Sequence, residues 1–257
     1  MRRVIFNQKG GVGKSTITCN LAAISAMEGK KTLVIDLDIQ GNSTHYLLGH
    51  KVTDPDKTSA HFFKACLSIA LFGSNHSDIA SLIHETPFQN LYVLPSHPDL
   101  EPLQGRLESR YKIFKLRDEL DKLEDFDEIY IDTPPILNFY SQSALIAANK
   151  CLIPFDCDSF AREALYTLTN SIAEVKADHN QNLEIEGIVV NQYQSQAKLP
   201  KQIVSELIEE GLPVLDSKIS PSIKVRESHT HSKPLIHYAP NHKLSAEFQA
   251  LHSELHD

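Results

Sequence analysis

The sequence has no tryptophan, two methionines and four cysteines, and none of the cysteines forms a CxxC pair. Isolated cysteines argue against a disulfide framework and against a zinc or iron–sulfur site, and they favour a reducing cytoplasm. No apolar run approaches the roughly 18 residues that a membrane helix requires, and no signal peptide precedes the first predicted strand. These absences leave an ordinary globular protein as the expected class.

The chain also lacks an excess of positive charge. It has 25 Lys and Arg against 33 Asp and Glu, which gives a formal net charge of −8. Any contact with a nucleic acid must therefore come from a local basic patch. With 257 residues and 41% hydrophobic composition, the chain is long enough to bury a sizeable core. We expect one domain over residues 1–257.

Short runs of β-branched and aliphatic residues alternate with longer amphipathic segments. The pattern predicts strands at 3–7, 32–36, 91–95, 127–132, 151–155 and 184–190. It predicts helices at 14–28, 59–71, 77–83, 100–123, 159–178 and 244–255. Continuous apolar strands between helices are typical of a parallel sheet that is covered on both faces. We therefore expect an α/β fold with a mostly parallel, twisted sheet and helices on both faces.

The stretch KGGVGKST, residues 9–16, lies between the first strand and the first helix. The strict pattern GxxxxGK[ST] fails because Gln8 occupies the place of its first glycine. Three glycines still allow the backbone to turn and to approach a ligand closely. Successive N–H groups then form an anion nest, and the helix N-terminus adds the positive end of its dipole.

This loop predicts a phosphate-binding site in which each side chain has a distinct task. Lys14 can reach the β- and γ-phosphates, the Ser15 hydroxyl can ligate Mg²⁺, and Thr16 can donate to the α-phosphate. The residues expected to contact the nucleotide are Gly10, Gly11, Val12, Gly13, Lys14, Ser15 and Thr16.

The loop resembles the deviant phosphate-binding loop (deviant Walker A) of the ParA/MinD ATPases, a family within the P-loop NTPases. The resemblance spans almost the whole chain and implies ATP and Mg²⁺ as cofactors. It also implies that Lys9, the first lysine of the loop, reaches across a homodimer to the partner's nucleotide. There it would add positive charge where the transferred phosphoryl group gathers negative charge, as an arginine finger does.

Acidic residues follow two of the predicted strands. The segment DLDIQGN, residues 36–42, resembles the family's DxDxQGN, in which the second aspartate positions or activates the attacking water. The resemblance assigns that catalytic role to Asp38 and places Asp36 at the Mg²⁺ site or in the switch segment. Asp132 ends the strand before Thr133 and two prolines, and it is the expected outer-sphere Mg²⁺ carboxylate. The alternative for a single aspartate at a strand end is a helix N-cap.

Two residues are candidates for contact with the base. Asn191 ends a predicted strand, and an amide can pair with an adenine edge through one donor and one acceptor. MinD-like relatives use an asparagine at the corresponding place, so the resemblance extends this role to Asn191, with a plain loop asparagine as the alternative. Pro221 lies near the expected adenine loop.

Four basic residues, Lys198, Lys201, Lys224 and Arg226, come from two segments that the family places near one surface. In ParA-type proteins such residues bind double-stranded DNA without sequence preference. Dimerisation doubles the number of neutralised phosphates, so binding depends steeply on salt. The alternative is ordinary surface lysines. His229 and His231 are expected in a solvated loop.

The resemblance implies an ATP-dependent dimerising switch that binds DNA in its ATP-bound state. Its output would be the partition of a chromosome, a plasmid or another cargo, with a ParB-like activator that accelerates slow hydrolysis. We expect a cytoplasmic, nucleoid-associated protein that does not contact a membrane. Since the loop begins at Lys9, we do not expect an N-terminal segment that reads an operator sequence.

Several alternatives share this fold. One is a MinD-like positioning ATPase that binds a membrane; the acidic residues of segment 244–255 instead favour a packed terminal helix. A second is an amide-forming metabolic ligase of the dethiobiotin or cobyrinic acid type. An iron–sulfur carrier is disfavoured by the missing CxxC pair, and a tyrosine kinase by the absence of a tyrosine-rich tail.

Overall fold

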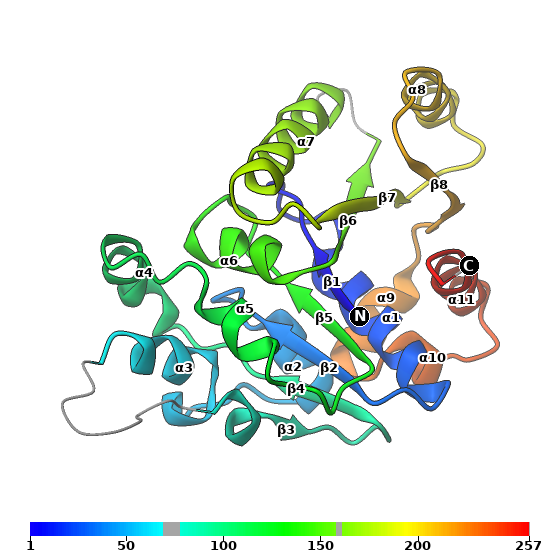
Figure 1. The fold of residues 1–257 in the computed structure, drawn as a ribbon. Coiled ribbons are helices and arrows are strands. Elements are labelled where there is room, and N and C mark those ends of the chain that lie inside the picture. The colour runs from blue at the N-terminus through cyan, green and yellow to red at the C-terminus, as the bar shows by residue number, and fades with distance from the viewer. Residues whose placement is uncertain (69–77, 158–160, 257) are drawn as a thin grey trace.

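The computed structural model describes residues 1–68, 78–157 and 161–256. Their strands form one eight-stranded sheet in the order β3-β4-β2-β5-β1-β6-β7-β8 (Figure 1). Neighbouring strands are parallel, apart from the antiparallel pair β3 and β4 at one edge. Helices cover both faces of this sheet, which confirms the predicted α/β fold.

The strands are β1 (Arg2–Ile5), β2 (Thr32–Asp36), β3 (His84–Glu85), β4 (Leu91–Leu94), β5 (Glu128–Asp132), β6 (Lys150–Asp156), β7 (Glu184–Asn191) and β8 (Val214–Lys218). The α-helices are α1 (Lys14–Met27), α2 (Asn42–Leu48), α3 (Ser59–Cys66), α4 (Leu100–Ser109), α5 (Lys115–Leu120), α6 (Phe139–Ala147), α7 (Ala161–Asp178), α8 (Lys198–Glu209), α9 (Ile223–Thr230), α10 (Leu235–Tyr238) and α11 (Lys243–Glu254). Short 3₁₀ turns occur at Pro55–Lys57 and Ile79–Leu82.

Each face of the sheet has its own apolar core. Successive strand residues point to opposite faces, so that in β2 Leu33 and Ile35 belong to one core and Val34 to the other. The first core lies under α3 to α8, and the second under α1, α2, α10 and α11. In Figure 1 the two groups of helices flank the sheet from opposite sides. The sheet is therefore buried on both faces, and its carboxyl edge stays available for a site.

Some predicted elements differ in the structure. The helix predicted at 100–123 is two helices, α4 and α5, because Tyr111 between them adopts a positive φ of 54° and ends the first. The helix predicted at 77–83 is only a 3₁₀ turn at Ile79–Leu82. The helix predicted at 59–71 ends at Cys66. Residues 69–71 of that prediction, residue 77 of the helix predicted at 77–83, and residues 159 and 160 of the helix predicted at 159–178 lie outside the described residues. No local pattern predicted α2, α6, α8, α9, α10, β3 or β8.

The terminal helix α11 is packed, as expected, and its neighbour is α1. Leu244, Phe248 and Leu251 of α11 are buried in the second core. Within residues 1–68, 78–157 and 161–256, no helix is both long enough and apolar enough to cross a membrane.

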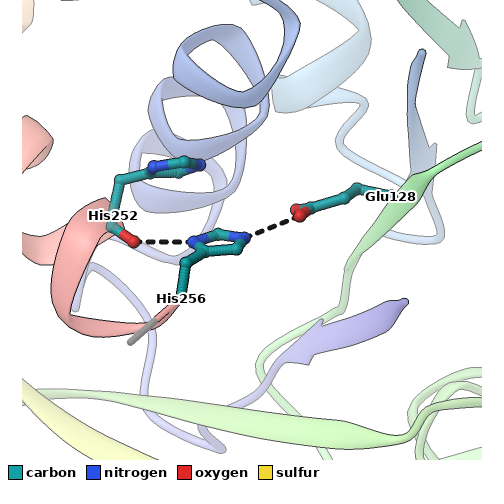
Figure 2. Close-up of side chains that lie close together, drawn as sticks. All are labelled: Glu128, His252 and His256. Atoms are coloured by element: carbon teal, nitrogen blue, oxygen red, sulfur yellow. Dashed lines mark hydrogen bonds and ion pairs between the residues drawn. The ribbon is translucent and has the colours of Figure 1, made fainter. Parts of the chain in front are cut away.

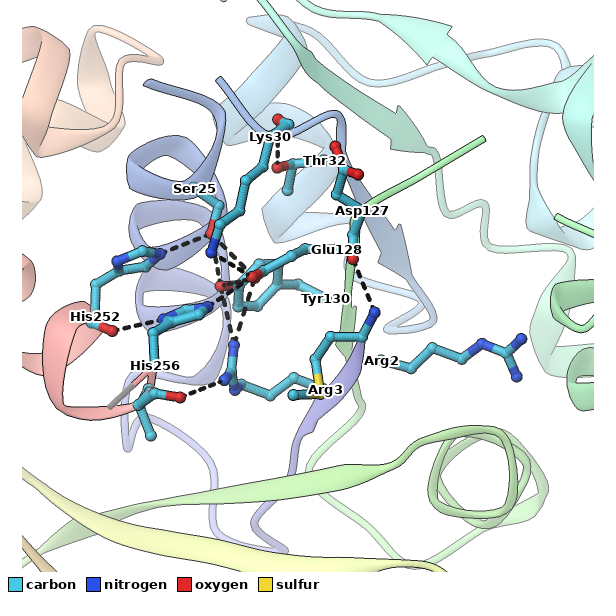
Figure 3. Close-up of polar contacts among 12 residues, drawn as sticks. Arg2, Arg3, Ser25, Lys30, Thr32, Asp127, Glu128, Tyr130, His252 and His256 are labelled. Carbon is cyan, nitrogen blue, oxygen red and sulfur yellow. Dashed lines mark hydrogen bonds and ion pairs between the residues drawn. The ribbon is translucent and has the colours of Figure 1, made fainter. Parts of the chain in front are cut away.

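A buried polar network at the amino edge of the sheet joins β5 to α1 and α11 (Figure 3). Glu128 is its centre: its Oε1 accepts from Lys30 Nζ at 2.8 Å, and its Oε2 from the Tyr130 hydroxyl at 2.8 Å. Burial opposes ionisation of Glu128, but these bonds and the neighbouring His256 outweigh it and lower its pKa to about 2. The buried Arg3 donates to Tyr130 at 3.0 Å and to Glu186 at 2.5 Å. The network therefore holds its charges in compensated pairs.

Two histidines one turn apart bring α11 to this network. His256 Nε2 lies 2.6 Å from Glu128 Oε1, and His252 Nε2 lies 2.8 Å from Ser25 Oγ, with the two rings 4.1 Å apart (Figure 2). The ligand atoms of the two histidines and Glu128 lie within 4.8 Å of one another, a spacing compatible with a metal ion. However, the Lys30 ammonium already compensates the Glu128 carboxylate. We therefore interpret the cluster as the anchor of α11.

His252 should make the anchor sensitive to acid. Burial and the neighbouring His256 lower the pKa of His252 from 6.5 to about 4. The unfolded chain then takes up this proton first as pH falls, so stability is lost between pH 6.5 and pH 4. Between pH 7 and about pH 5, we expect the unfolding free energy of His252→Gln to fall by about 2 kcal/mol less than that of the parent protein. Urea titrations at the two pH values measure this difference.

The matched control is His50→Gln, which removes an exposed imidazole after α2. It should lose as much stability as the parent protein over the same interval. This pH interval lies above the range in which Glu128 is protonated, because the stability that the Glu128 carboxylate contributes is lost between pH 4.5 and about 2. Equal losses for the parent and His252→Gln would contradict a neutral, buried His252.

Candidate functional site

The loop between β1 and α1 lies at the carboxyl edge of the sheet. Gly11 and Gly13 adopt φ values of 78° and 93°, which residues with a Cβ rarely adopt. A Cβ on Gly13 would also lie 2.3 Å from Asn191 Nδ2. That amide nitrogen donates to the Val12 carbonyl at 2.9 Å. The end of β7 thus clamps the backbone of the phosphate-binding loop, and only glycine fits at position 13.

The two lysines of the loop lie in opposite environments. Lys14 is 7% exposed, and its ammonium donates to the Lys9 carbonyl at 3.1 Å. Burial lowers the pKa of Lys14, and the charges of Asp132 and Asp38 oppose that shift. The Lys9 side chain is 39% exposed, with its Nζ 3.8 Å from Asp156 Oδ2. The Lys14 side chain therefore lies inside the site, whereas the Lys9 side chain lies at its rim.

Asp36 and Asp132 are register partners on the adjacent parallel strands β2 and β5, and both are fully buried. The Ser43 hydroxyl donates to Asp132 Oδ2 at 2.7 Å, and the Ser15 hydroxyl also bonds to that carboxylate. Burial raises the pKa of both carboxyl groups, and for Asp36 the charge of Asp132 adds to the effect. A divalent cation would relieve this repulsion, and the hydroxyl and carboxylate oxygens are donors that suit Mg²⁺.

Asp36 holds the segment that carries Asp38. Its Oδ2 accepts from the Thr44 amide at 2.8 Å and from the Thr44 hydroxyl at 2.7 Å, and its Oδ1 accepts from the Asp38 amide at 3.1 Å. The Ser96 hydroxyl, at the end of β4, donates to the Asp38 carbonyl at 2.6 Å. Because its oxygens are engaged, the geometry favours Asp36 as a residue that fixes the Asp38 segment over one that ligates the metal directly.

A cavity of about 680 Å³ opens in front of the loop. It is lined by Gly10, Gly11, Gly13, Lys14, Ser15, Thr16 and Asp38, and it continues to Glu101, Gln104, Pro134, Pro135 and Asn138. Asp38 is 7% exposed, and burial raises its pKa, which hydrogen bonding from Gln40 and the charge of Lys14 oppose. Glycine backbone, one buried cation and an acid thus meet in one cavity, which fits a nucleotide's phosphates.

A second cavity, of about 490 Å³, adjoins the loop on its other side. Asn191 and Pro221, the two residues predicted near the base, both line it, together with Thr16 and Arg226. With one N–H given to Val12, Asn191 keeps its carbonyl oxygen and one N–H for a ligand. Two cavities that share the loop match a ligand whose phosphates and base lie on either side of it.

The four predicted DNA-binding residues fall in two pairs. Lys198 and Lys201 are exposed on α8, which Figure 1 places beside α7 and away from α9. Lys224 and Arg226 lie on α9, where the Lys224 ammonium is paired with Glu227 at 2.7 Å. Arg226 lines the 490 Å³ cavity. The pair on α8 is therefore the more open to an extended polyanion.

Three side chains of the site were not predicted from the sequence. Ser43 and Thr44 bond the two buried aspartates, and the Ser-Thr pair directly after DLDIQGN is the signal that could have found them. His229 was expected in a solvated loop, which is wrong. It lies in α9, and its Nε2 is 3.0 Å from Thr16 Oγ1. No local pattern marks it, since the contact spans 213 positions of the chain.

The clamp on the loop predicts unequal effects of two glycine substitutions. Gly13→Ala should abolish ATP binding, because it combines a left-handed φ with a Cβ contact of 2.3 Å to Asn191. Gly105→Ala, in α4, is the matched control: its φ is not positive, nothing lies within 4 Å of its Cβ, and it does not line the cavity at the loop. Calorimetric titration with Mg–ATP measures both. Tight binding by Gly13→Ala would show that the loop adopts another conformation when a nucleotide binds.

Comparison with known proteins agrees with this geometry. A family model described as an AAA domain matches residues 3–185. Chromosome partitioning protein ParA of Myxococcus xanthus is 36% identical over 256 residues, covering 98% of this chain and 86% of that protein. The structure of the cell division ATPase MinD of Pyrococcus furiosus superposes with a TM-score of 0.77 at 27% identity, covering 99% of this chain and 98% of that one.

Cobyrinic acid a,c-diamide synthase of Mycobacterium smegmatis, with a bound ATP analog and magnesium, superposes with a TM-score of 0.81, covering 98% of this chain and 92% of that one. Its identity of 24% shows a common fold alone. The 36% identity to ParA over nearly the full length shows the family as well as the fold. The protein therefore belongs to the ParA family of P-loop ATPases.

Proposed function

We propose that the protein is a dimerising switch whose ATP-bound form holds DNA and whose ATP hydrolysis releases it. The observation that carries this proposal is the contrast between the two loop lysines. Lys14 is buried beside the phosphate cavity, whereas Lys9 is 39% exposed at the rim and directed to Asp156. A second copy that closes over the rim would meet Lys9 first, which suits a cation that acts on the partner's nucleotide.

The chain's own residues supply most of what hydrolysis needs. Lys14 places one positive charge in a buried site, where electrostatic stabilisation is strongest. Mg²⁺, when bound, would be held by Ser15, with Asp132 as an outer partner, and would neutralise charge on the phosphates. Asp38 can orient the attacking water and accept its hydrogen bond from within the same cavity. Asp36 and Ser96 keep the Asp38 backbone in place.

DNA binding would follow from dimerisation, because a dimer has twice as many exposed lysines as one subunit. The exposed Lys198 and Lys201 of one subunit neutralise few phosphates, but a dimer presents twice as many. A ParB-like activator would then set the lifetime of the DNA-bound dimer by accelerating hydrolysis. The name of the Myxococcus relative supports chromosome partition as the output. A nucleoid-associated location in the cytoplasm follows from the same proposal.

One alternative is favoured by a specific feature of the cavity. The 680 Å³ cavity extends past the phosphate-binding loop to Glu101, Gln104 and Asn138. Polar groups opposite the phosphates are what an amide-forming ligase would use to hold a small carboxylic acid. ATP turnover that depends on such an acid, and not on DNA or a dimer, would favour the ligase. A MinD-like protein would instead co-sediment with liposomes in the presence of ATP.

Removal of Asp38 should separate binding from hydrolysis. Asp38→Asn keeps an oxygen that can accept from the Gln40 amide, a bond that measures 3.0 Å in the parent. We expect it to bind Mg–ATP, to remain dimeric with ATP, and to lose about 100-fold or more of the phosphate release rate. Light scattering and a phosphate-release assay measure these properties. The control Asp56→Asn alters an exposed acid of the first 3₁₀ turn. A parental rate for Asp38→Asn would assign the catalytic role elsewhere.

DNA binding should depend on ATP and fall steeply with salt. We expect random-sequence duplex DNA to bind with Mg–ATP, and to bind weakly with ADP or without nucleotide, as measured by fluorescence anisotropy. Lys201→Ala should weaken binding and reduce the salt slope by about 0.9 for each phosphate that the variant no longer neutralises. Lys64→Ala, an exposed lysine on α3, removes the same charge and should leave the slope unchanged. Equal binding with ATP and ADP would contradict the switch.

A further inference from the structure

His229 touches the phosphate-binding loop from outside it. It lies in α9, its Nε2 is 3.0 Å from Thr16 Oγ1, and it lines the 680 Å³ cavity. Its ring stacks on Tyr46 of α2 with the centroids 3.8 Å apart and an interplanar angle of 14°. Neither the predicted cycle nor the proposed DNA contacts give this residue a task.

The surroundings of His229 fix the plane of its ring. Tyr46 is fully buried, and its hydroxyl lies 2.8 Å from Ser228 Oγ, the neighbour of His229 in α9. The Ser228 hydroxyl in turn contacts the Val225 carbonyl at 2.8 Å. The stack on an anchored Tyr46 therefore fixes the plane of the His229 ring, and in that plane Nε2 is the nitrogen that meets Thr16.

The bond between His229 and Thr16 has a defined direction when a phosphate is present. Phosphate oxygens only accept hydrogen bonds at neutral pH, so a Thr16 hydroxyl that binds a phosphate must give up its single proton. The contact with His229 is then possible only if the imidazole donates. Burial and the nearby His45 lower the pKa of His229 to about 4, so the ring is neutral near pH 7 and carries one N–H.

We propose that His229 is a positioning residue for the nucleotide: its Nε2–H donates to Thr16 Oγ1 and directs the Thr16 hydroxyl proton to the α-phosphate of bound ATP or ADP. This inference rests on the proposed role of Thr16 at the α-phosphate. It adds a contact from α9, at the opposite end of the sequence, to the binding of the phosphates.

Thr18 illustrates the arrangement that His229 prevents. It lies two residues further along the same helix, and its hydroxyl donates back to the Lys14 carbonyl at 2.9 Å. A threonine in a helix readily forms such a bond to a carbonyl of the preceding turn. The contact with His229 holds Thr16 Oγ1 toward the two cavities that Thr16 lines. A hydroxyl held in place costs less conformational entropy when the ligand binds.

The test is a double-mutant cycle on His229 and Thr16. His229→Phe keeps a ring to stack on Tyr46 but lacks the N–H, and Thr16→Val keeps the shape of threonine without its hydroxyl. The affinities for Mg–ATP and Mg–ADP are measured by calorimetry for the parent, each single variant and the pair. We expect His229→Phe to weaken both nucleotides by about five-fold, the effect of one hydrogen bond. Both nucleotides should respond alike because both carry the α-phosphate.

In the Thr16→Val background the same substitution should have no further effect, because the acceptor is already gone. His229→Gln should restore part of the affinity, since its amide supplies a donor. A merely structural role for the ring would predict equal losses in both backgrounds and no rescue by glutamine. If His229→Phe does not fold, His229→Met, of similar bulk and without a donor, takes its place.

The outcomes separate the inference from the proposal on which it rests. If Thr16→Val binds both nucleotides as tightly as the parent, the role of Thr16 fails, and the inference fails with it. If Thr16→Val weakens binding but His229→Phe does not, only the inference is overturned. Additive losses in the double variant would likewise overturn it.

Discussion

The burial of two carboxylates side by side is the constraint on which the rest of the site depends. Asp36 and Asp132 occupy paired positions at the carboxyl ends of adjacent strands, where both are excluded from water. Two like charges in a medium of low dielectric repel strongly unless cations and hydrogen-bond donors compensate them. Lys14 and the donors of α2 provide that compensation, and a divalent cation would complete it. The two buried acids therefore suit a ligand that binds together with a divalent cation.

At the opposite edge of the sheet, a buried carboxylate is compensated without a ligand. There Glu128 is buried near the amino end of β5, but Arg3, Lys30, His252 of α11 and His256 just after that helix surround it. The charges balance within the chain itself, so this edge anchors the last helix. The same strand, β5, thus carries two different acids. The charge of Glu128, at its amino end, is compensated by other side chains of the protein, whereas Asp132, at its carboxyl end, lies where a cation would bind. This difference explains why one end of the sheet is a scaffold and the other a site.

The sequence predicted well what local patterns encode. The central parallel strands, the loop at Lys9 to Thr16 and the acids at strand ends follow from runs and motifs of a few residues. The missed elements depend on tertiary contacts. Helix α9 contains few buried residues and has a polar sequence, so its pattern resembled a solvated loop. Its contact with Thr16 joins segments 213 positions apart, and a local pattern carries no information on such a contact.

Helix α9 also connects the two halves of the candidate nucleotide site. His229 lines the cavity in front of the phosphate-binding loop, and Arg226, less than one turn earlier, lines the cavity behind it. The two cavities share Gly11, Gly13 and Thr16, so a nucleotide that spans the loop would place its phosphates and its base against the same short helix. Helix α9 therefore contributes to the lining of both cavities. The stack of His229 on Tyr46 also joins α9 to α2, the helix in which the Thr44 hydroxyl donates to the buried Asp36.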